Sequence, residues 1–87
     1  MELNNNNIVV LRNGQRGLVT SFQDKPFTIA FANYSNPISK YKDFKQKNTA
    51  YDIVAIYNGT DLENPTMAYK KTFSLEHLQL IWKEETK

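Results

Sequence analysis

Two arginines flank an Asn-Gly pair in the run Arg12-Asn13-Gly14-Gln15-Arg16. A tight turn at this pair would bring both guanidinium groups to one end of a hairpin, where they could hold a phosphate or carboxylate through paired hydrogen bonds. The alternative is a hairpin tip whose charges are merely solvated. We take Arg12, Asn13 and Arg16 as candidate ligand-binding residues.

A second candidate lies in the polar run of residues 39–47, SKYKDFKQK, which carries four lysines, one acid and two aromatic rings. Rings that stack on a base, beside cations that neutralise a phosphate, are typical of sites for nucleotides and single strands. In the alternative, the rings pack inward and the lysines keep a connecting loop soluble. The candidate binding residues of this loop and its flanks are Tyr34, Lys40, Tyr41, Lys42, Lys45 and Tyr51.

Residues suited to catalysis or metal binding are sparse. The chain has one histidine, His77, no cysteine and no serine in a glycine-flanked turn. Asp61 and Glu63 lack the further ligands of a calcium loop, so we expect solvated carboxylates. Asp52 either has a structural role, pairing with a cation or capping a turn, or contacts a ligand. We therefore predict no enzyme activity, no metal site and no cofactor.

The composition limits what the chain can be. With 87 residues and a mass of 10.1 kDa it is expected to form one domain with a modest core. The net charge of +2 is too small to indicate a nucleic-acid binder by itself. The absence of cysteine suits a reducing compartment, and we find neither a secretion signal nor an apolar run long enough to span a membrane. We expect a soluble protein in the cytoplasm of a host cell, with no membrane partner.

Turn residues and apolar runs predict short strands in the first part of the chain. Asn13-Gly14 indicates a hairpin between strands at residues 8–12 and 17–22, with Gly17 permitting a bulge. Asp24-Lys25-Pro26 indicates a second turn before a strand at residues 27–31. The asparagines at 4–7 compete with regular structure through their own hydrogen bonds, so we predict that residues 1–7 form a flexible arm.

The second part of the chain is expected to supply a central strand and a closing segment. Residues 51–57, YDIVAIY, combine β-branched and aromatic side chains on both faces of a strand. Between residue 34 and this strand we predict a long loop with one short helical turn near 41–46. Residues 74–83 form either a turn followed by a strand at 78–82 or one amphipathic helix, and the turn and strand are slightly favoured.

Together these elements predict a mainly β protein. About five short strands with turns at each junction suggest a small antiparallel SH3-like barrel, because closure removes exposed sheet edges. In this interpretation residues 8–87 are a single β-barrel domain.

Three sequence motifs carry a resemblance to a known group of proteins. They are Leu11-Arg12-Asn13-Gly14 to Gly17-Leu18-Val19, Tyr51-Asp52-Ile53-Val54 with Ile56-Tyr57, and Leu80-Ile81-Trp82-Lys83-Glu84. With these motifs the chain resembles small, mostly uncharacterised proteins of phages and prophages of low-GC Gram-positive bacteria. The resemblance implies a phage origin, and the group has no agreed activity that could be carried over to this chain.

These observations favour binding over catalysis. We expect an accessory protein that interferes with a host process, plausibly antiviral defence, by sequestering an anionic nucleotide-like ligand or by blocking a host protein. A module that binds single-stranded nucleic acid is the alternative. A small enzyme acting on a nucleotide signal through His77 and Asp52 is the third class. A homodimer would bury aromatic surface that a monomer leaves exposed.

Overall fold

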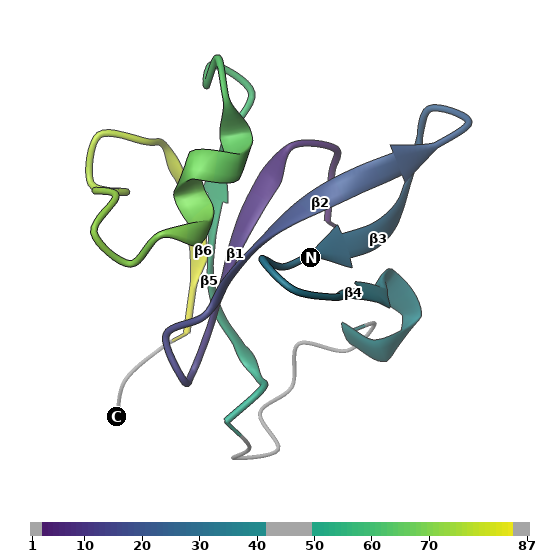
Figure 1. The fold of residues 1–87 in the computed structure, drawn as a ribbon, viewed down its shortest axis with the longest axis horizontal. Helices are drawn as coiled ribbons and strands as arrows, with labels where there is room; N and C mark the ends of the chain where they lie inside the picture. The colour runs from purple at the N-terminus through teal and green to yellow at the C-terminus, as the bar shows by residue number, and fades with distance from the viewer. Residues whose placement is uncertain (1–2, 42–49, 85–87) are drawn as a thin grey trace.

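The computed structural model describes residues 3–41 and 50–84, and these residues are mainly β (Figure 1). Six strands and two 3₁₀ turns follow one another along the chain. They are β1 (Asn7–Leu11), β2 (Arg16–Phe22), β3 (Lys25–Ala30), β4 (Ser35–Pro37), η1 (Ile38–Tyr41), β5 (Ile53–Asn58), η2 (Pro65–Tyr69) and β6 (Leu80–Lys83). Neither 3₁₀ turn has the length or the apolar character needed to cross a bilayer, and the described residues contain no longer helix.

The strands form one antiparallel sheet in the order β4-β3-β2-β1-β5-β6. Within the described residues β4 and β6 are the edges of this sheet and do not pair, so the closure expected of a barrel is not observed. The sheet has six strands rather than about five, because the three residues of β4 pair with β3 inside a segment that we expected to be a loop. The strand at residues 51–57 was expected to be central, and β5 is an inner strand between β1 and β6.

Apolar residues cover both faces of the sheet. One cluster, which includes Val9, Val19 and Ile29, packs against Leu3 from the N-terminal segment. On the opposite face Ile8 and Leu18 pack against η2 and the segment after it. Residues that alternate along β1 and β2 therefore point into two separate small cores, as the period of two in a strand requires.

Both predicted hairpin turns form, with details that differ from the expectation. At the first turn Gly14 has φ of +90° and Asn13 does not have a positive φ, because the loop between Leu11 and Gln15 contains three residues rather than two. Gly17 pairs regularly with Val9, and no register shift occurs there.

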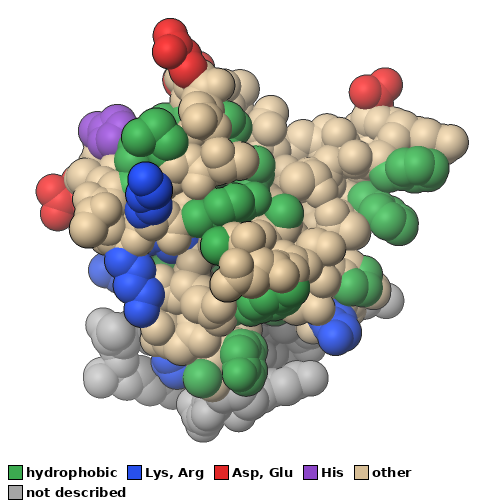
Figure 2. Space-filling model, in the orientation of Figure 1, with side chains coloured by type: hydrophobic (Ala, Val, Ile, Leu, Met, Phe, Trp, Pro, Cys, Tyr) green, Lys and Arg blue, Asp and Glu red, His purple; other side chains and the backbone are tan. Residues whose placement is uncertain are grey.

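The second turn lies one residue earlier than predicted. Its left-handed residues are Gln23 and Asp24, with φ of 52° and 64°, whereas Lys25 and Pro26 already belong to β3. β2 extends beyond its pairing with β1, and β3 extends beyond its pairing with β4. The end of the β2–β3 hairpin therefore projects from the sheet (Figure 1). Hydrophobic side chains gather on this projection, with an acidic side chain near its end (Figure 2).

The N-terminal segment, which we expected to be a flexible arm, contains two residues that are buried against the sheet. Leu3 lies in the core, and Asn7 belongs to β1 with only 3% of its surface exposed. The Asn7 side chain accepts a hydrogen bond of 2.8 Å from the backbone N–H of Asn4. The tendency of asparagine to bond nearby backbone stabilises a turn here instead of fraying the chain.

The C-terminal segment adopts the favoured alternative. The backbone N–H of Leu78 donates to the Leu75 carbonyl oxygen at 3.0 Å and closes a turn. After it β6 pairs with β5 through Ile56 and Trp82, so residues 74–83 are not an amphipathic helix.

Candidate functional site

The β1–β2 turn lies beside two segments that are distant in the sequence. The backbone N–H groups of Arg12 and Asn13 donate to the carbonyl oxygens of Asp52 and Ala50, at 2.8 and 2.9 Å. The end of β6 lies at the same end of the molecule (Figure 1). The sheet thus gathers the first turn, the approach to β5 and the residue that follows β6 into one region.

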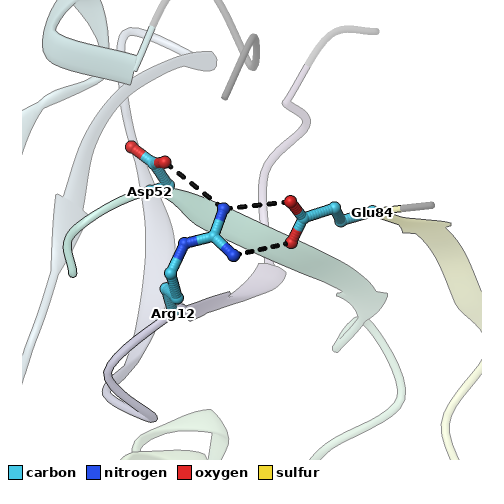
Figure 3. A network of polar contacts seen from close by, with 3 residues as sticks. All are labelled: Arg12, Asp52 and Glu84. Carbon is cyan, nitrogen blue, oxygen red and sulfur yellow. Dashed lines mark hydrogen bonds and ion pairs between the residues drawn. The ribbon is translucent and has the colours of Figure 1, made fainter. Parts of the chain in front are cut away.

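Arg12 is held between two carboxylates (Figure 3). Its Nη1 and Nη2 donate to the two oxygens of Glu84 at 3.2 and 2.9 Å, and Nη2 also lies 3.4 Å from Asp52 Oδ2. The hydrogen bond to Glu84, with the charges of both carboxylates, raises the pKa of Arg12 above its ordinary value. One positive and two negative charges give this group a net charge of −1, which is poorly suited to gripping a phosphate. The structural role expected of Asp52, pairing with a cation, is confirmed.

Arg16 points to a different part of the molecule. Its Nη1 donates to the carbonyl oxygens of Lys70, at 2.8 Å, and of Phe73, and its Nη2 lies 3.4 Å from the carbonyl oxygen of Lys71. The side chain thereby fastens the segment after η2 to the β1–β2 hairpin. The two guanidinium groups that were expected to form one grip are engaged by separate partners within the chain.

A polar and aromatic surface surrounds the turn. Asn13 Nδ2 donates to Gln15 Oε1 at 2.9 Å, and the hydroxyl of Tyr34 donates to the same oxygen at 3.2 Å. The Tyr34 ring stacks on Phe31 with a centroid distance of 4.8 Å and remains 40% exposed. Tyr51 follows Ala50, which accepts from Asn13, and is 62% exposed. We call Asn13, Gln15, Tyr34 and Tyr51 the turn surface.

Two further candidates lie elsewhere. Lys40 is exposed on η1, which packs against β3 and β4 rather than against the β1–β2 turn. Tyr41 is half-buried against the core, and its hydroxyl accepts a hydrogen bond of 2.9 Å from Asn36. Burial raises the pKa of Tyr41 above its ordinary value. Lys42 and Lys45, and the helical turn expected near 41–46 beyond Tyr41, lie outside the described residues.

The structure adds residues that the sequence did not single out. Gln15 links Asn13 to Tyr34 through its side-chain oxygen. Its position between the two arginines could have identified it from the sequence. The Lys71 ammonium lies 3.5 Å from the point that a Cβ on Gly14 would occupy, so this side chain covers the turn. No local pattern predicts the position of Lys71, because the contact joins residues far apart in the chain.

The remaining titratable candidates form no cluster. Asp61 and Glu63 are exposed, and His77 is exposed with its ring 5.7 Å from that of Phe73. Across residues 3–41 and 50–84, no three histidine, cysteine or acidic side chains are grouped so as to hold a metal ion.

In comparisons with known proteins, no family model, curated protein or solved structure matches this chain.

Proposed function

We propose that this chain is a non-enzymatic binding protein that interferes with a host process by binding a host protein through the turn surface. The observation that carries this proposal is the exposure of two tyrosines near the turn: Tyr34, whose hydroxyl donates to the Gln15 amide, and Tyr51, which follows Ala50, the acceptor of the Asn13 backbone N–H. Tyrosine supplies a large contact area and a polar hydroxyl at a small cost in side-chain entropy, and it is enriched at protein interfaces.

The charges of the region favour a protein target over an anionic nucleotide-like ligand. Arg12 is already paired with two carboxylates, and Arg16 donates to backbone carbonyl groups. Lys71 also reaches the turn, but a phosphate would have to displace the partners of Arg12 and Arg16 before it gained either guanidinium group, whereas a protein surface can bind the exposed rings and amides as they stand.

The resemblance to phage proteins supports action inside an infected bacterium, with antiviral defence as the process affected. An SH3-like arrangement of the strands stays a prediction, because closure into a barrel is not observed among the described residues.

Mass spectrometry of the denatured, freshly purified chain tests the proposal. Tagged chain isolated from a low-GC Gram-positive host should carry a host protein in a fixed ratio, and it should release no nucleotide. Tyr51→Ala should lose the host protein. Met67→Ala is the matched control, because Met67 is also exposed but lies on η2, away from the turn surface. A released nucleotide without a bound protein would instead support sequestration.

Single-stranded nucleic acid is the second candidate because Tyr34 forms a stacked pair with Phe31 and exposes part of its ring. Such a ring can act as a stacking platform for a base. This candidate requires oligonucleotide binding that weakens steeply with salt. The salt dependence should be smaller in a variant with alanine at Lys40, Lys42, Lys45 and Lys47. Undetectable binding at low salt would remove it.

A further inference from the structure

The end of the β2–β3 hairpin is a ribbon of two strands that we call the arm, residues 20–28. The pairing of β1 with β2 ends at Leu18, and the pairing of β4 with β3 begins at Thr28. In the described part of the chain, the strand residues between these points and the turn pair only with each other. A ribbon of two strands is marginally stable in water by itself. The arm therefore needs support from its base.

The arm is fixed to the body of the protein both next to its base and at its turn. Next to the base, the backbone N–H of Asn6 donates to the Val19 carbonyl oxygen at 3.1 Å. At the turn, Asn5 Nδ2 donates to the Asp24 carbonyl oxygen at 3.4 Å. The hydroxyl groups of Thr20 and Thr28 are hydrogen-bonded across the two strands. These contacts hold the arm in one direction before any partner binds, which lowers the entropy cost of binding.

A bulge sets the direction of two phenylalanines on the arm. The register shifts between Thr20 and Ser21, so Thr20 pairs with Thr28, Ser21 pairs with Pro26, and Phe27 is the extra residue. The Phe27 ring thus lies 5.5 Å from that of Phe22. A bulge re-aims a side chain in this manner.

The result is an exposed apolar pair on a projecting element. Phe22 is 60% and Phe27 is 56% exposed. The turn beyond them holds Gln23 and Asp24 in the left-handed region, which side chains other than glycine rarely adopt. An exposed apolar pair on a supported arm is typical of an interaction surface. We propose that Phe22 and Phe27 insert into an apolar groove on a partner protein. The partner's class rests on the proposed function, and the surface is distinct from the turn surface.

The exposed area argues against a second copy as the occupant. The two rings expose together roughly 230 Å² per chain, taking about 200 Å² for a whole phenylalanine side chain. Two copies meeting through these rings would bury roughly 460 Å², well below the ~1,200 Å² of the smallest stable interfaces. A groove that closes around the arm buries more, because its walls also cover the edges and the opposite face.

The chemistry of the arm argues against other occupants. Pro26 has no N–H to donate, and the bulge interrupts the same strand, so addition of a further strand at this edge is disfavoured. Asp24 and Lys25 cancel in charge, which offers nothing to a phosphate backbone. Insertion of the two rings into a membrane is also disfavoured, because the Asp24 carboxylate at the turn would have to enter the bilayer before them.

The test places a photo-crosslinking phenylalanine derivative at Phe22 of the full chain in a low-GC Gram-positive host. One discrete adduct is expected, and its added mass should differ from 10.1 kDa, the mass of a second copy. Phe27→Ser in the same chain should reduce the adduct more than about tenfold, as loss of a residue central to an interface does. The control carries the crosslinker at Leu80, which is 48% exposed on β6. This control should not give the adduct.

Four results would overturn the proposal: no adduct at Phe22, an equal adduct at Leu80, an adduct to a second copy, or flotation of the purified chain with vesicles of anionic phospholipid that Phe22→Ser abolishes. Failure of the proposed function gives a different pattern. If Tyr51→Ala leaves host-protein capture intact while the phenylalanine variants abolish it, the turn surface is not the binding surface and the arm proposal stands.

Discussion

Gly17 gives the sharpest test of the packing beneath the turn surface. A Cβ on this residue would lie 2.6 Å from Ile29 Cγ2 and 2.8 Å from Phe31 Cε1. Both neighbours are buried and cannot move away freely. Overpacking of this kind costs about 1–3 kcal/mol, and alanine regains about 0.5–1 kcal/mol over glycine within a strand. The middle of each range gives a net cost, so Gly17→Ala should lower the free energy of unfolding by about 1 kcal/mol.

Equilibrium urea unfolding measures this change, which corresponds to a fall in Tm of about 4–8 °C for each kcal/mol in a chain of this size. Ser21→Ala is the control on the same strand, and it should change stability by less than about 0.5 kcal/mol. In a double-mutant cycle with Ile29→Ala, the cost of alanine at Gly17 should shrink, because one of the two clashes is gone. An alanine variant as stable as the parent chain would refute the packing argument.

Three further predictions concern the ends of the chain and the half-buried tyrosine. Leu3→Ala should cost about 2–5 kcal/mol in urea unfolding, because Leu3 is buried in the core, whereas the exposed Asn4→Ala should cost little. The pKa of Tyr41 is raised in the folded state, so its contribution to stability is complete below pH ~10 and is lost as the pH rises through the raised value. Tyr41→Phe should therefore show a smaller fall in urea midpoint between about pH 9 and pH 11 than the parent chain does. Arg12→Met should lower the urea midpoint, and the loss should be smaller at about 1 M salt because salt screens the ion pair. Adding Glu84→Gln to the Arg12→Met chain should lower the midpoint little further. If the losses of the two single variants add in the double variant, the ion pair does not contribute to stability.

Local sequence signals predicted the strands well where a turn residue and an apolar run agree. Asn13-Gly14 predicted the first hairpin, and the segment around residues 53–58 was recognisable from its β-branched residues. The second turn was misplaced because Pro26 suggested a turn, whereas it lies in β3 beside a turn that contains no glycine. A strand accepts proline where it has no neighbour on that side, as at Pro26, because β4 pairs with β3 only from Thr28 onwards, so this residue did not decide between the two.

The site was harder to predict because its contacts are long-range. Arg12 and Arg16 are close in sequence, and this proximity suggested one shared grip. Their partners lie 72 and 54 positions away, at Glu84 and Lys70, and only the strand order brings these residues near. The exposed Tyr34 and Tyr51 were identified from composition, but which of the candidates share a surface depended on the fold.

The pairing of β1 with β5, and the contact of Arg12 with Glu84, have a consequence for the synthesis of this chain. An emerging polypeptide can close the first hairpin early, but the partners of β1 on its other side appear only when most of the chain has been translated. Loop closure over such separations slows folding. Until then the apolar edge of β1 is open to aggregation, so a ribosome-bound chain that lacks residues 53–84 should depend on chaperones more than the released protein does.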